Sequence, residues 1–141
     1  MFFQGLFNLS TPPSEEERDN ISADSMLSSG LKQEDLYALA VKLKKHEWSL
    51  EKYGDVGITV LDKAFCGCIY KLATFDDGAA YLVKLMEDKN MDWDAGHSLV
   101  LQDAIVRCGK DALPHLQKVR NHPDLAERCI EMINQGAKTA L

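Results

Sequence analysis

The chain has 141 residues, of which 45% are hydrophobic and 27% are charged, as is ordinary for a globular protein. A chain of this length suits one domain and can bury a sizeable core without disulfides or metal ions. The net charge of −6 and the isoelectric point near 5.1 argue against a general surface for nucleic acid or for anionic membranes. We therefore expect no nucleic-acid partner and no membrane partner, whereas a basic protein partner would suit the charge.

The sequence offers no segment for export or membrane insertion. No apolar run approaches the roughly 20 residues that span a bilayer. Residues 1–10 are apolar but lack a basic n-region and are interrupted by polar residues, so we expect no signal peptide. The cysteines, Cys66, Cys68, Cys108 and Cys129, lie in helical patterns, which favours a reducing compartment over a disulfide framework. These features predict a cytoplasmic protein.

Residues 1–30 form the first predicted region, an apolar arm followed by an acidic linker or weak helix. Ser14 and Glu17 have the spacing of a capping box, which predicts a helix over residues 15–27. Two interpretations of the arm remain open: packing on the rest of the chain, or contact with a partner, including a homodimer. The apolar residues of the arm are Phe2, Phe3, Leu6, Phe7 and Leu9.

Residues 31–141 are predicted to form a single helical domain, with repeat-like hairpins from about residue 56. A first helix is indicated by apolar residues at helical spacing. These residues are Leu36, Leu39, Ala40 and Leu43. Gly54 and Gly57 then predict a turn, so residues 53–57 are interpreted as the joint between this helix and the hairpins.

The clearest hairpin is predicted over residues 94–121. Its first helix has an apolar face made by Val100, Leu101, Ala104, Ile105 and Cys108. Gly109 follows and favours a left-handed cap, while Pro114 suits the first turn of a second helix. That second helix carries Ala112, Leu113, Leu116 and Val119. Aspartates before the helices are predicted N-caps, namely Asp76, Asp77 and either Asp92 or Asp94.

An upstream stretch repeats this pattern. At a shift of 36 residues, Leu61, Ala64, Phe65, Cys68, Ile69 and Leu72 match His97, Val100, Leu101, Ala104, Ile105 and Cys108. At a shift of 34, Tyr81, Leu82, Lys84 and Leu85 match His115, Leu116, Lys118 and Val119. The periodicity resembles the helix-pair repeats of HEAT and armadillo proteins, whose period is about 40 residues. The resemblance implies an all-α fold of stacked antiparallel hairpins, with an ordinary helical bundle as the alternative.

The sequence contains no recognisable catalytic or metal-binding motif. Cys66 and Cys68 are two residues apart, so on a helix their side chains point to different faces. No C-x-x-C or H-x-x-x-H pair, phosphate-binding glycine loop or nucleophile elbow occurs. We therefore predict no catalytic residue, no metal and no cofactor. Whether the protein is an enzyme stays open, although the sequence leans against it.

His122, Pro123 and Asp124 form one sharp local motif. It resembles the histidine-proline-aspartate tripeptide of J-domain co-chaperones, and the resemblance implies stimulation of a chaperone ATPase. Gly109 and Pro114 depart from that pattern, because the family has one long helix before the motif. The alternative is a simple helix start, with Asn121 or His122 as N-cap and Pro123 in the first turn.

In stacked hairpins, exposed positions on the second helices line one face, and such faces bind proteins or peptides. Tyr81 corresponds to His115, and Lys84 corresponds to Lys118. These four are the predicted partner-binding residues, with a solvated polar face as the alternative.

The leading functional hypothesis is a non-catalytic helical protein-protein interaction module. One version is an inhibitor or immunity-type protein that masks a basic partner, since opposite charge speeds association. The alternatives are the J-domain-like co-chaperone, and an enzyme or ligand carrier with an unrecognised site.

Overall fold

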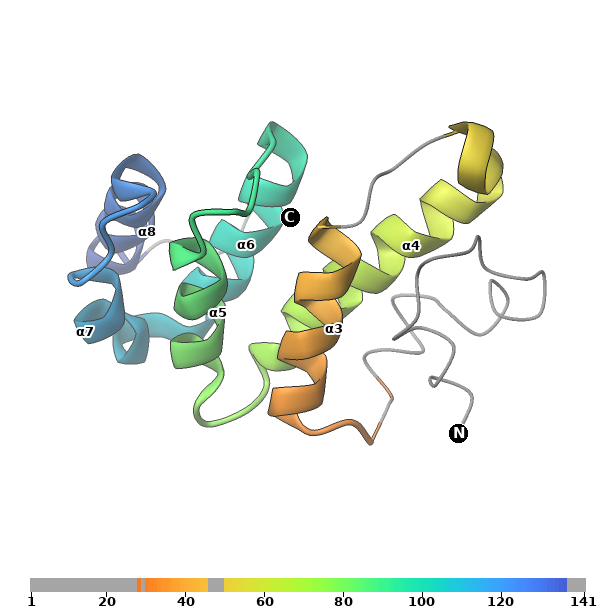
Figure 1. The fold of residues 1–141 in the computed structure, drawn as a ribbon. Coiled ribbons are helices and arrows are strands. Elements are labelled where there is room, and N and C mark those ends of the chain that lie inside the picture. Colours follow the sequence, from red (N-terminus) through yellow and green to blue (C-terminus); the bar gives the residue numbers. More distant parts are fainter. Residues whose placement is uncertain (1–27, 29, 46–49, 137–141) are drawn as a thin grey trace. The chain divides into compact units, whose positions relative to one another are not determined.

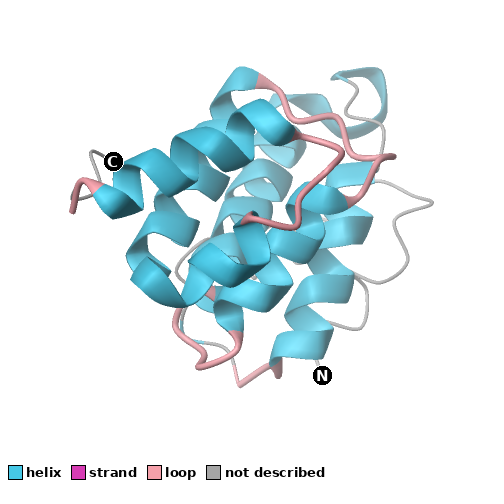
Figure 2. Cartoon of the chain, turned by 90° about the vertical axis from the view of Figure 1, so that its left-hand side faces the viewer, coloured by secondary structure: helices cyan, strands magenta, loops and turns pink. Residues whose placement is uncertain are grey.

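A computed structural model describes residues 28, 30–45 and 50–136 of the chain. These residues form helices joined by turns and loops, and none of them lies in a strand (Figures 1 and 2). The predicted all-α class is therefore confirmed for this part of the protein. Within it, no helix combines the length and apolar character needed to cross a bilayer. The predicted arm and its acidic linker lie outside the described residues, apart from Ser28 and Gly30.

The chain divides into two compact units, residues 1–71 and residues 72–141. In the first unit, α3 (Gln33–Lys45) buries the predicted apolar face. The Lys44 ammonium lies over the ring of the buried Phe65, 5.8 Å from its centre, at a distance where a cation is attracted to the face of an aromatic ring. The buried residues of α3 are Leu36, Leu39, Ala40 and Leu43.

The second helix, α4 (Leu50–Leu72), runs without interruption through residues 53–57. The prediction of a joint at these residues is therefore wrong. A glycine inside a helix costs about 1 kcal/mol relative to alanine, which weakens a helix without ending it. Farther along, α4 contributes a buried face to the core, and this burial favours the helical conformation. That face contains Leu61, Ala64, Phe65, Cys68 and Ile69.

The second unit is built around α6. Both α5 and α8 pack against α6, and α7 contacts α5 and α8. Buried side chains from all four helices form its core, including Leu82, Leu85, Met86, Leu101, Ile105, Leu116, Leu125 and Cys129. In chain order its elements are α5 (Gly78–Glu87), α6 (Ala95–Cys108), the 3-10 helix η2 (Gly109–Ala112), α7 (Leu113–Leu116) and α8 (Pro123–Asn134).

The predicted hairpin over residues 94–121 is present with a shorter second helix. Its first helix is α6, but α7 ends at Leu116 instead of continuing through Val119. Pro114 lies in the first turn as predicted. Gly109 has the expected positive φ of 70°, but its ψ of −146° lies outside the left-handed helical region. Whether the hairpins stack as a true repeat stays a prediction.

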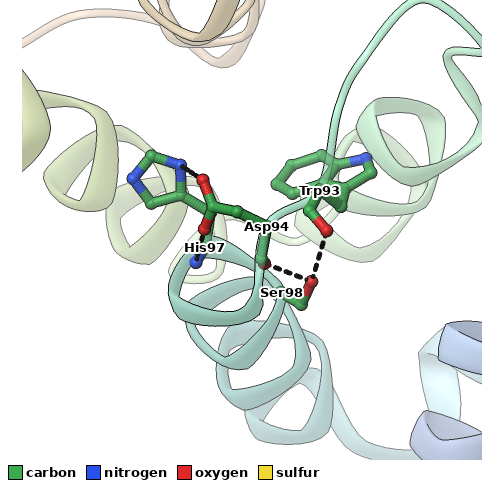
Figure 3. A network of polar contacts seen from close by, with 4 residues as sticks. All are labelled: Trp93, Asp94, His97 and Ser98. Atoms are coloured by element: carbon green, nitrogen blue, oxygen red, sulfur yellow. Dashed lines mark hydrogen bonds and ion pairs between the residues drawn. The ribbon is translucent and has the colours of Figure 1, made fainter. Parts of the chain in front are cut away.

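The start of α6 is fixed by a compact set of polar contacts (Figure 3). The Asp94 carboxylate accepts a hydrogen bond from the His97 N–H at 2.8 Å, which confirms Asp94 as N-cap. The Ser98 hydroxyl donates to the carbonyl oxygen of Asp94 at 2.6 Å and to that of Trp93 at 3.2 Å. Asp77 is the N-cap residue of α5, as predicted, but its side chain does not make the capping hydrogen bond expected of it.

The start of α5 depends on a glycine. The Gly78 N–H donates to the carbonyl oxygen of Phe75 at 3.0 Å, which closes a tight turn after Leu72. A Cβ at position 78 would collide with the Leu72 carbonyl oxygen, a backbone atom that cannot rotate away. Only glycine therefore allows α5 to begin at this point without a shift of the backbone.

Candidate protein-binding groove

A shallow hollow of about 250 Å³ lies between α5 and the segment that contains α7. On α5, its lining residues are spaced by three, four and seven positions from Ala80, so they share one face of the helix. On the other segment, His115 and the residues three and four positions later line the opposite wall. We call this hollow the α5–α7 groove, and it is lined by Ala80, Val83, Lys84, Glu87, His115, Lys118 and Val119.

The chain continues to turn after α7, and this turn positions the second wall. The Lys118 N–H donates to the carbonyl oxygen of His115 at 3.1 Å, and the Val119 N–H donates to that of Leu116 at 3.1 Å. These bonds span three residues, as in a 3-10 helix, and they continue the helical course for about one turn. His115, Lys118 and Val119 therefore remain on one side of the segment although α7 itself has ended.

Glu87 joins the two walls of the groove. One carboxylate oxygen accepts a hydrogen bond from the backbone N–H of Asn121 at 2.7 Å. Both oxygens accept from the backbone N–H of Arg120 at 3.0 Å. In return, the Asn121 side-chain amide donates to the Glu87 carbonyl oxygen at 2.6 Å. Hydrogen bonds to an ionised carboxylate are stronger than those between neutral groups. We call these contacts the Glu87 clamp, which ties the end of α5 to the loop before α8.

The groove combines an apolar part with positive charge. The Val83 side chain is buried, and Ala80 and Val119 are half-buried, so these three present apolar surface. Lys84, His115 and Lys118 are exposed around it. Glu87 adds one negative charge, but its carboxylate already accepts hydrogen bonds from the backbone. An apolar side chain with acidic neighbours would complement this arrangement.

Three of the four predicted partner-binding residues line this groove: Lys84, His115 and Lys118. Tyr81 is half-buried and is not among the lining residues. That they bind a partner stays a prediction. The sequence analysis missed Ala80, Val83, Glu87 and Val119. The helical spacing from Ala80 to Glu87 could have identified the first three, whereas the contact of Glu87 with residues 33 and 34 positions later left no local signal.

Two of the four cysteines are core residues. None of the four forms a disulfide, and Cys68 and Cys129 are fully buried, as predicted from their positions in the helical pattern. Burial raises the pKa of Cys68 and raises that of Cys129 to about 12. Burial and the nearby carboxylate of Asp111 raise the pKa of Cys108 to about 11. These three thiols are therefore protonated near neutral pH and are poor nucleophiles.

Cys108 also lines a second hollow of about 420 Å³. The Arg107 guanidinium at its edge pairs with the buried Asp103 carboxylate at 3.2 Å. The Cys108 thiol lies 3.5 Å from the Ala104 carbonyl oxygen, to which it can donate. Because the thiol is protonated and the guanidinium is paired, this hollow presents no activated nucleophile.

The His122-Pro123-Asp124 motif forms the first turn of α8. His122 is the N-cap residue, although its side chain makes no capping hydrogen bond, and Pro123 occupies the first turn. Asp124 lies in the same turn, where the helix dipole favours a carboxylate. This is the simple helix start expected as the alternative to the J-domain resemblance. The four-residue α7 precedes it in place of a long helix, and the co-chaperone function stays a prediction.

No protein-family model matches the chain, and no curated protein or solved structure matches it either. The function is therefore inferred from the groove and its surroundings alone.

Proposed function

We propose that the protein is a non-catalytic helical interaction module whose α5–α7 groove binds a peptide segment of another protein. The segment that fits the groove carries an apolar side chain flanked by acidic residues. One observation carries this proposal: Lys84, His115 and Lys118, which come from two separate segments of the chain, surround the apolar surface of one hollow.

The apolar part of the groove supplies the contact energy. Each Å² of apolar surface removed from water contributes about 25 cal/mol, so covering the exposed parts of Ala80 and Val119 favours an aliphatic or aromatic side chain. Val83 is already buried, so it contributes to the shape of the groove more than to the apolar area that a partner would cover. The clamp at Glu87 keeps the two walls together before a partner arrives, which lowers the cost of ordering them on binding.

Local charge selects the partner segment. Charges separated by more than about 8 Å are largely screened at physiological salt, so a bound peptide responds mainly to the charges that line the groove, which are those of Lys84, Lys118 and Glu87. A basic partner, including the target of an inhibitor or immunity-type protein, is a separate proposal that rests on the net charge of −6. The groove itself favours an acidic segment.

The test compares two labelled peptides of equal length in which one leucine is flanked either by glutamates or by lysines. We expect the acidic peptide to bind more tightly, with an affinity that falls as salt rises. The double variant Lys84→Ala/Lys118→Ala should lose about tenfold in affinity, since two charge-assisted contacts disappear. Fluorescence anisotropy measures each dissociation constant.

The matched control is Lys89→Ala/Lys110→Ala, which removes the same charge from exposed lysines that do not line the groove. An equal loss in the control would mean that total charge governs binding, which contradicts a role for the groove. The proposal also fails if the basic peptide binds more tightly or if neither peptide binds. Val119→Ser, which changes no charge, should weaken the acidic peptide by removing apolar contact.

A further inference from the structure

The α5–α7 groove contains a histidine, His115, and histidine is the side chain that changes its charge between about pH 5 and pH 8. The side chain of His115 is exposed. Among the described residues, its ring has no hydrogen-bond or ion-pair partner. The ring can therefore take up a proton and meet a ligand without first breaking a contact within the protein.

The other histidines have different surroundings. The Nδ1 atom of His97 lies 3.4 Å from the Asp94 carboxylate at the start of α6 (Figure 3). His122 is half-buried and is the N-cap residue of α8. Neither of these two lines the groove, and His46 lies outside the described residues. Of the described histidines, His115 alone can change the charge of the groove lining.

Few charged groups surround His115 in the groove. Lys84 and Glu87 come from α5, and Lys118 comes from the same segment as His115. The elements η2 and α8 also pack against α7, but none of their charged side chains lines the groove. The net charge of the lining is therefore +1 with a neutral His115 and +2 with a protonated one. The charged residues outside the lining are Lys110 and Asp111 on η2 and Asp124, Glu127, Arg128 and Glu131 on α8.

Glu87 does not neutralise a proton on His115 through an ion pair. Its carboxylate accepts hydrogen bonds from the backbone N–H groups of Arg120 and Asn121, which direct it toward the loop before α8. A protonated His115 thus adds its charge to those of Lys84 and Lys118, on the side of the groove that an acidic ligand would meet.

We propose that His115 makes the binding of an acidic peptide in the α5–α7 groove dependent on pH, with tighter binding at lower pH. This inference rests on the proposed function of the groove. The carboxylates of a bound peptide favour the protonated ring, so binding takes up protons and strengthens as the pH falls. Because an exposed pair of opposite charges contributes only modestly, we expect the affinity to rise about threefold.

The test measures the dissociation constant of the glutamate-flanked leucine peptide at pH 6 and at pH 8, by fluorescence anisotropy at constant ionic strength. Free glutamate side chains ionise near about pH 4.3, so the peptide keeps its charge across this range. It should bind about threefold more tightly at pH 6. A peptide of equal length with glutamines in place of the glutamates should bind equally at both pH values, because it carries no charge that a protonated ring would attract.

Two variants at the same position set different expectations. His115→Gln should bind the acidic peptide as the unmodified protein does at pH 8, and should gain nothing at pH 6. His115→Lys carries its charge at both pH values and should bind tightly at both. His97→Gln is the matched control and should keep the increase of about threefold, since His97 does not line the groove.

The outcomes separate this inference from the proposed function. Equal affinity for the acidic peptide at pH 6 and pH 8 would overturn the pH dependence and leave peptide binding in place. An increase that persists in His115→Gln, or that appears equally with the glutamine peptide, also overturns it, because the charge of His115 would not be the cause. Absence of binding at both pH values would overturn the proposed function, and this inference with it.

Discussion

Helix α5 and residues 109–121 carry matched residues but differ in local structure. Lys84 and Lys118 are equivalent in the sequence pattern, and both line the α5–α7 groove. Yet α5 is a regular helix of ten residues, whereas the matched segment is a 3-10 helix, a four-residue α-helix and a further turn. The comparison shows that the side-chain pattern can place residues at a common groove without setting the length of the helix that carries them.

The difference follows from the residues with which α5 and residues 109–121 begin. α5 begins at Gly78, which is buried against the backbone, and no proline interrupts the helix. The matched segment begins at Gly109 with a backbone conformation outside both helical regions, and Pro114 removes one N–H donor. The segment keeps short helical hydrogen bonds of its own, and the Glu87 clamp ties its end to α5.

The largest expected effect concerns the start of α5. Gly78→Ala should lower the free energy of unfolding by about 3 kcal/mol, because the added methyl group collides with the Leu72 carbonyl oxygen. Thermal and urea unfolding followed by circular dichroism measure the loss. Gly96→Ala, in the first turn of α6, is the matched control, since its Cβ would meet only Asp94 Oδ1 at an ordinary 3.7 Å. Similar stability changes in the two variants would contradict the close approach at Gly78.

A smaller effect is expected at the start of the matched segment. Gly109→Ala should cost about 2 kcal/mol, because φ of 70° with ψ of −146° is a conformation that residues with a Cβ rarely adopt. Space is not the reason, since nothing lies within 4 Å of a Cβ placed there. Urea unfolding measures the cost. Gly30→Ala also enters open space but at ordinary φ, so equal costs at both positions would rule out backbone strain at Gly109.

The smallest expected effect concerns the Glu87 clamp, which joins the two walls of the groove. Glu87→Ala should lower the free energy of unfolding by about 1 kcal/mol, because its hydrogen bonds to Arg120 and Asn121 are lost at a partly exposed site. Amide hydrogen exchange at Arg120 and Asn121 should accelerate more than exchange within α5. Glu127→Ala, an exposed position on α8, is the control. Unchanged exchange at both amides in Glu87→Ala would show that the clamp does not hold this segment.

The sequence predicted the helical class and most of the buried faces, because apolar spacing reflects directly which side of a helix is covered. The repeat pattern, which matches Lys84 with Lys118 and Tyr81 with His115, also selected three residues of the groove. These are Lys84, His115 and Lys118. The sequence failed where a long-range contact or a backbone requirement decides the outcome. The continuous α4 across Gly54 and Gly57, the early end of α7 and the role of Glu87 left no signal in the local sequence pattern.

The Glu87 clamp also bears on the order of folding. It joins residues 33 positions apart, and closing a chain loop of that length costs about 3 kcal/mol in entropy before any constant term. The clamp contributes less than this, so its hydrogen bonds cannot draw the two ends together by themselves. We expect them to form only after α5 and α8 have packed on α6. The α5–α7 groove would then be completed late, and a chain whose second unit is only partly folded would lack it.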